Sequence, residues 1–219
     1  MDDGKIILRN YLRGKKIERG VETFMDAQAQ AEKLGKLLAD VIGSDFEDVA
    51  EEDLAAALRI VLKRAYDDSA AVAATVQRQM NRKLMLDIGV LRGEFDPAVA
   101  DAVAEELAGK IVTAEFVTNL IQKNAIAAID ETIRKNAEAQ ENMGLSVHIV
   151  RDYSDVGLRA GTPYAEPCEW CMERCDEWDN YQDAYSAGCF ERHPGCLCTI
   201  DYQVGRTHTR SEGTGWVDV

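Results

Sequence analysis

The chain has 219 residues, of which 46% are hydrophobic and 29% are charged, and its formal net charge is −14. This length and composition are typical of a globular protein with a substantial core, in one large domain or in one domain with a small appendage. The negative charge argues against broad binding of nucleic acid or of anionic membranes, because both need a basic surface that displaces counterions.

The first 19 residues form a basic N-terminal arm in this acidic chain. Residues 1–19 contain six basic and three acidic side chains. Such a charge run is usually a solvated terminus, but it could also dock on DNA or on an acidic partner. We therefore keep a DNA contact through this arm as an open alternative.

Residues 20–144 are expected to form a helical body. Thr23 or Asp26 is predicted to open a first helix, whose apolar residues follow three- and four-residue spacing and which ends near Gly43. A long second helix is expected at about 48–90, because its apolar residues keep the same spacing.

A short third helix is expected after Asp96, with Asp96 as its cap and Pro97 at its first position. A fourth, long helix is predicted from Thr113 to about Glu141. One stripe of apolar residues on it is expected to face the core: Phe116, Leu120, Ile121, Ile126, Ile129 and Ile133.

The polar side of this fourth helix carries a candidate ion pair. Asp130 and Arg134 are four residues apart, which is the spacing at which opposite charges meet on a helix surface. We therefore expect these two side chains to pair with each other.

The pattern changes from helical to extended after residue 144. Residues 145–153 and 196–204 alternate and are rich in β-branched residues, so each predicts a strand, and residues 205–219 are interpreted as a tail. The expected fold is mainly α: a helical body with a small, irregular α+β module rich in Cys and His at 145–204.

All six cysteines of the chain lie in this module, between residues 168 and 198. No apolar segment with a cleavage site opens the chain, so we expect cytoplasmic synthesis, where thiols stay reduced and clustered cysteines bind metal more often than they form disulfides. No stretch reaches the roughly 20 apolar residues of a membrane helix, and no membrane contact is expected. A small module with little hydrophobic core of its own needs an additional cross-link, and in the reducing cytosol a structural zinc ion can supply it.

The spacing of these residues fits a closed zinc site made by two short chelating loops about twenty residues apart. The candidate ligands are Cys168, Cys171, His193, Cys196 and Cys198. The first four are favoured, and Cys198 competes for the last position. Cys175 and Cys189 could pair, bind the same ion or fill the core as small apolar side chains. Simple buried thiols or disulfides throughout the module remain the alternative.

Three enzymatic interpretations of the cysteines are weaker. The sequence P-C-x-x-C at 167–171 is half the signature of zinc deaminases, but the upstream histidine, His148, lacks the glutamate two residues further on. A redox role is disfavoured because neighbouring acids raise thiol pKa values. A metal-dependent hydrolase would need an open zinc position, whereas a cysteine-rich ligand set is typical of a filled, structural site.

The module resembles a known family through its combined motif. C-x-x-C, a spacer and R-H-x-x-C-x-C-T-φ-x-Y (φ apolar) follow a helical body, and the motif spans Cys168 to Tyr202. In this it resembles the minor head proteins of tailed phages and prophages, the Mu protein F-like head-morphogenesis group. The likeness covers about residues 113–203, and Cys175 and Cys189 are additional to the pattern.

The resemblance implies a non-enzymatic virion protein that assists head assembly or DNA delivery. Its partners would be the portal or the major capsid protein, and it would be present in several copies in the phage head and in the host cytoplasm during assembly. A zinc-ribbon-like module that binds nucleic acid or protein is the alternative from the residues alone.

Overall fold

The computed structural model describes residues 21–43, 51–107, 113–153, 169–193, 196, 198–205, 208–211 and 215–218. The basic arm and Cys168 lie outside these described residues. The protein is 63% helix and 11% strand, with a small antiparallel sheet near its C-terminus. The predicted fold class, a helical body with a small α+β module, is confirmed.

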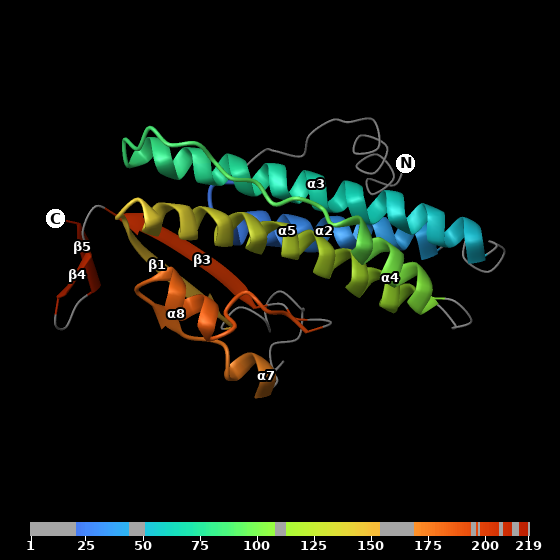
Figure 1. Cartoon of the computed structure of the whole chain (residues 1–219). Coiled ribbons are helices and arrows are strands. Elements are labelled where there is room, and N and C mark those ends of the chain that lie inside the picture. Colours follow the sequence, from blue (N-terminus) through green and yellow to red (C-terminus); the bar gives the residue numbers. More distant parts are fainter. Residues whose placement is uncertain are drawn as a thin grey trace.

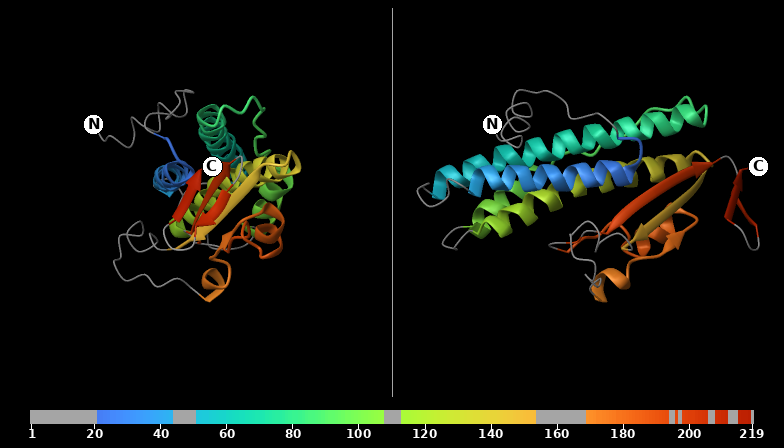
Figure 2. Two further views of the ribbon diagram at one scale, coloured as in Figure 1. Left: turned by 90° about the vertical axis from the view of Figure 1, so that its left-hand side faces the viewer. Right: turned by 180° about the vertical axis from the view of Figure 1, so that it is seen from behind.

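Within the described residues, four helices build the body: α2 (Phe24–Gly43), α3 (Glu51–Lys83), α4 (Pro97–Leu107) and α5 (Ala114–Asn142). Helix α5 packs along both α2 and α3, and α4 packs on α3 (Figures 1 and 2). Within the described part of the chain, no helix is both long enough and apolar enough to cross a membrane.

The helices begin next to residues whose side chains cap the first turn. At α2, Thr23 Oγ1 accepts from the amide of Asp26 at 3.1 Å, and the Asp26 carboxylate accepts from the amide of Thr23 at 3.0 Å. This reciprocal arrangement satisfies two amides that the helix leaves free. The predicted cap of α4 is confirmed as well, because Asp96 accepts from the amide of Ala98. At α5, Thr113 caps the predicted helix start by accepting from the amide of Phe116.

The second helix is shorter than predicted, because α3 ends at Lys83 instead of near residue 90. The chain then runs extended alongside α5, where Asn136 bonds both backbone groups of Leu91 at 3.0 and 2.5 Å. Thr132 Oγ1 accepts from the amide of Gly93 at 3.0 Å. These side chains replace the hydrogen bonds that a longer helix would have made within itself.

The apolar stripe of α5 lies in the core. Ile121, Ile126, Ile129 and Ile133 are at most 1% exposed, and Phe116, near the start of the helix, is 36% exposed. The same core cluster continues into the C-terminal module through Ile149, Ile200 and Tyr202. The helical body and the module therefore share one hydrophobic core.

The sheet of the module has β1 (Ser146–Asp152) at its centre, with β2 (Glu177–Trp178) and β3 (Thr199–Gly205) antiparallel on either side. The full length of β1 pairs with β3, from Ser146 opposite Gly205 to Asp152 opposite Thr199. Strands β1 and β3 contact α5, and β3 also contacts α2, while α8 (Tyr181–Ser186) contacts both β1 and α5 (Figure 1). The two strands predicted from the sequence are thus confirmed, with shifted ends.

The segment interpreted as a tail contains two further strands, β4 (His208–Ser211) and β5 (Gly215–Asp218), which pair antiparallel with each other.

Candidate metal centre

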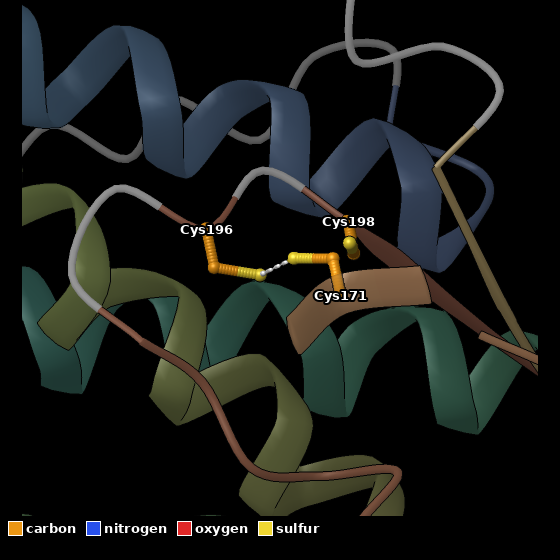
Figure 3. Close-up of side chains that lie close together, drawn as sticks. All are labelled: Cys171, Cys196 and Cys198. Carbon is orange, nitrogen blue, oxygen red and sulfur yellow. Dashed lines mark hydrogen bonds between the residues drawn. The ribbon is translucent and has the colours of Figure 1, made fainter. Parts of the chain in front are cut away.

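Three cysteines from two parts of the module meet in its interior. Cys171 lies on the short helix α7 (Glu169–Met172), whereas Cys196 and Cys198 precede β3 (Figure 3). Their sulfur atoms all lie within 4.8 Å of one another, and each residue is at most 5% exposed. The Cys171 and Cys196 sulfurs are 3.8 Å apart. Zn–S bonds of about 2.3 Å in a tetrahedron place two sulfurs about 3.8 Å apart, so this spacing fits a metal–thiolate site.

His193 lies beside one of these sulfurs, that of Cys171. Its Nε2 is 3.0 Å from Cys171 Sγ, and its ring packs edge-on against Trp170 with centroids 5.2 Å apart. The fifth predicted ligand, Cys168, lies outside the described residues. Cys198, predicted from the sequence as an alternative for the last ligand position, belongs to the sulfur cluster. The choice of ligands among the five candidates stays a prediction.

The two additional cysteines differ from each other. Cys175 Sγ donates to Cys198 Sγ at 3.8 Å, and burial raises the pKa of the Cys175 thiol. Cys189 is fully buried in the main core, where burial raises its pKa to about 12. Cys189 is therefore a small core side chain that remains a thiol. All five cysteines that the structure describes are free, so it contains no disulfide within that part of the chain.

Arg192 connects the sulfur cluster to the helical body. Its guanidinium forms a two-point ion pair with Asp130 of α5, one contact being Nη2 to Oδ1 at 3.0 Å. Its Nη1 donates to the carbonyl of Cys198 at 2.8 Å and lies 3.6 Å from Cys196 Sγ. The side chains of the pair are only 4% and 5% exposed.

The predicted pairing of Asp130 with Arg134 is therefore wrong. Arg134 pairs with Glu131 at 2.7 Å and with Glu138 at 3.5 Å, on the more exposed side of the helix. Asp130 faces the module, and its partner comes from a loop 62 residues further along the chain. A buried carboxylate requires a buried cation, which the solvent-facing Arg134 does not supply.

Arg151 of β1 is a second buried guanidinium at the cluster, and sequence reasoning missed it. Its Nη1 donates to the carbonyls of Cys189 and Glu191, both at 2.7 Å, and its Nη2 lies 3.5 Å from Cys196 Sγ. One signal could have found it: in the alternating strand, residue 151 shares the core-facing register of Val147 and Ile149. A charged residue in that register needs a buried partner.

The contacts of Arg151 and Arg192 with the cluster, together with the hydrogen bond between Cys196 and Cys198, shift the pKa values of these two thiols in opposite directions. A hydrogen bond from Cys198, together with the charges of Arg192 and Arg151, lowers the pKa of Cys196 to about 4. The same hydrogen bond and burial raise the pKa of Cys198. The two guanidiniums therefore favour the thiolate form of Cys196, which is the form that binds metal.

The backbone of the centre is also held by the helices. Gln28 of α2, which is 1% exposed, donates to the carbonyl of Cys198 at 2.6 Å. Together with the Asp130–Arg192 pair, this bond fastens the cluster to both α2 and α5. The sulfur cluster could therefore hold a metal ion that joins α7, the strand β3 and the helical body.

No protein-family model, curated protein or solved structure matches this chain. The geometry of the cluster and the motif in the sequence therefore carry the functional argument.

Proposed function

We propose that this protein is a non-enzymatic minor head protein of a phage or prophage, with its C-terminal module held together by a structural zinc ion. The observation that supports the zinc centre is the buried cluster of Cys171, Cys196 and Cys198, with sulfurs within 4.8 Å of one another. Three cysteines in a closed, buried site are typical of structural zinc, whereas catalytic zinc keeps an open position.

The role in head assembly is supported by the motif. C-x-x-C followed by R-H-x-x-C-x-C is the combination by which the chain resembles head-morphogenesis proteins. The position of Arg192 within this motif also has a structural explanation, because Arg192 holds Asp130 of the body and the carbonyl of Cys198. The helical body would contact the portal or the major capsid protein.

Zinc content tests the first half of the proposal. The purified full chain should contain one zinc per molecule, and a chelator should expose the module to protease while the helical body stays folded. The serine variants of Cys171 and Cys196 should lose the metal, whereas Cys189→Ser is the matched control and should keep it. A chain without stoichiometric zinc, or a module whose protease resistance is unchanged by chelation, would refute the zinc centre.

Co-assembly tests the second half. The chain should be expressed with the portal and major capsid proteins encoded in the same genome, and the heads should be sedimented. The proposal predicts that the chain sediments with the heads or with the portal. Heads that form equally well without the chain and that never carry it would refute the role in assembly.

A further inference from the structure

The sulfur cluster lies between two buried guanidiniums, and one of them has no carboxylate partner among the described residues. Arg192 is balanced by Asp130 at 3.0 Å. Arg151 is 1% exposed, its contacts in the described part of the chain include backbone carbonyls, the Cys196 sulfur and the ring of Trp170, and its Nε has no hydrogen-bond partner there. A buried cation without a counter-charge is strongly unfavourable, and a negative charge on the cluster, whose Cys196 sulfur lies 3.5 Å from Arg151 Nη2, would offset it.

The possible ligand sets differ in this charge. A divalent ion with three thiolates and a neutral imidazole carries one net negative charge, which balances Arg151. The same ion with four thiolates carries two, which leaves one buried negative charge in excess. The balanced set consists of the three buried sulfurs of Cys171, Cys196 and Cys198 and of His193, whose Nε2 lies 3.0 Å from Cys171 Sγ.

We propose that Arg151 and Arg192 set the charge of this centre, so that it takes a divalent, thiophilic metal ion on three thiolates and His193. The inference rests on the proposed zinc centre and deepens it. Both guanidiniums approach the same ligand, with N–H groups 3.5 and 3.6 Å from Cys196 Sγ. They act as positioning residues, because hydrogen bonds from outside the ligand shell orient the ligands and tune the metal.

Cys175 is excluded from the ligand set by the same balance. Its thiol donates a hydrogen bond to the sulfur of Cys198 at 3.8 Å. Cys168 is likewise outside the set, since a fourth thiolate from either residue would add an uncompensated charge.

A charge-swap cycle on the full chain tests the inference. His193→Cys adds one thiolate and leaves the buried centre, counted with both arginines and Asp130, with a net charge of −1. Asp130→Asn removes one buried negative charge and leaves a net charge of +1. The double variant has a net charge of zero, as the wild type does. Zinc affinity is measured by competition with a chromophoric chelator. Each single substitution should weaken zinc binding by about 10- to 100-fold, and the double variant should bind at least about 10-fold more tightly than the two single effects combined would give.

A variant that removes a positive charge, where Asp130→Asn removes a negative one, is the matched control for this cycle. Arg151→Gln removes the cation that balances the centre, so it should weaken zinc binding by itself and should give no rescue with His193→Cys. This arm also tests the inference if Asp130→Asn does not fold. In the cobalt-substituted protein, Cys175→Ser and Cys168→Ser should leave the thiolate-to-metal charge-transfer intensity unchanged.

Two kinds of result separate this inference from the proposed function. If the wild-type chain binds no zinc, the proposed zinc centre itself fails. If the wild type binds zinc but the effects of His193→Cys and Asp130→Asn are additive, or Cys175→Ser or Cys168→Ser lowers the charge-transfer intensity as Cys171→Ser does, only the charge-balance inference is overturned.

Discussion

The buried Asp130–Arg192 pair makes a quantitative prediction about stability. Asp130→Ala removes both carboxylate oxygens from a guanidinium whose side chain is 4% exposed. Arg192 cannot lose its charge, and its other contacts are a backbone carbonyl and a sulfur atom. Removing one partner of a buried ion pair costs about 3–5 kcal/mol, and we expect a loss of that size in the free energy of unfolding.

The matched control is Arg134→Ala on the same helix. Its carboxylate partners Glu131 and Glu138 are 29% and 47% exposed, so solvent screens these pairs. Solvent-exposed ion pairs contribute about 0–1 kcal/mol, and Arg134→Ala should stay within that range.

Urea unfolding at a fixed free zinc concentration, followed by circular dichroism, measures both variants. Zinc must be held constant because a ligand of the folded state adds its own stabilisation. Equal losses for Asp130→Ala and Arg134→Ala would show that the buried pair does not fasten the module to α5. A loss below about 1 kcal/mol for Asp130→Ala would show the same.

Three further predictions concern the metal, a helix cap and the extended segment. Chelation should change the fluorescence of Trp170, whose ring packs against His193, while most of the helical signal remains. Asp26→Asn should lower the melting temperature at neutral pH. The hydrogen bond from Thr23 lowers the pKa of Asp26 in the folded state. The Asp26 carboxylate therefore stabilises the fold above pH 3.8, its ordinary pKa, and this stabilisation is lost as the pH falls through the lowered pKa. A difference from wild type that persists in strong acid would contradict this explanation. Asn136→Ala should cost about 1–3 kcal/mol and speed hydrogen exchange at the Leu91 amide, because two backbone groups lose their partner; unchanged exchange would argue against the bond.

The local features of the fold could be predicted from the sequence. Thr113 and the Asp96–Pro97 pair mark helix starts because their hydrogen bonds reach only two or three residues along the chain. The apolar stripe of α5 and the alternation of β1 are also local, since each follows from the repeat of a single element. The clustering of the cysteines in the sequence predicted a metal site in the module.

Long-range partners were decided by the tertiary structure alone. The second helix stops at Lys83 because the backbone of Leu91 and Gly93 finds other hydrogen bonds, with Asn136 and Thr132, which lie 45 and 39 residues further along the chain. Asp130 pairs with Arg192 and not with Arg134, because one face of α5 is covered by the module. The spacing of residues along one helix does not show which of its faces becomes buried.

The candidate metal centre depends on both kinds of information. The sequence alone determined which residues are candidates, because thiols and imidazoles at short spacing are the groups that bind zinc. Only the folded chain placed Cys198 in the cluster, moved Cys189 into the core and brought Arg151 to the sulfurs. Burial and charge balance act between residues that are distant in sequence, and they act only after the chain has folded.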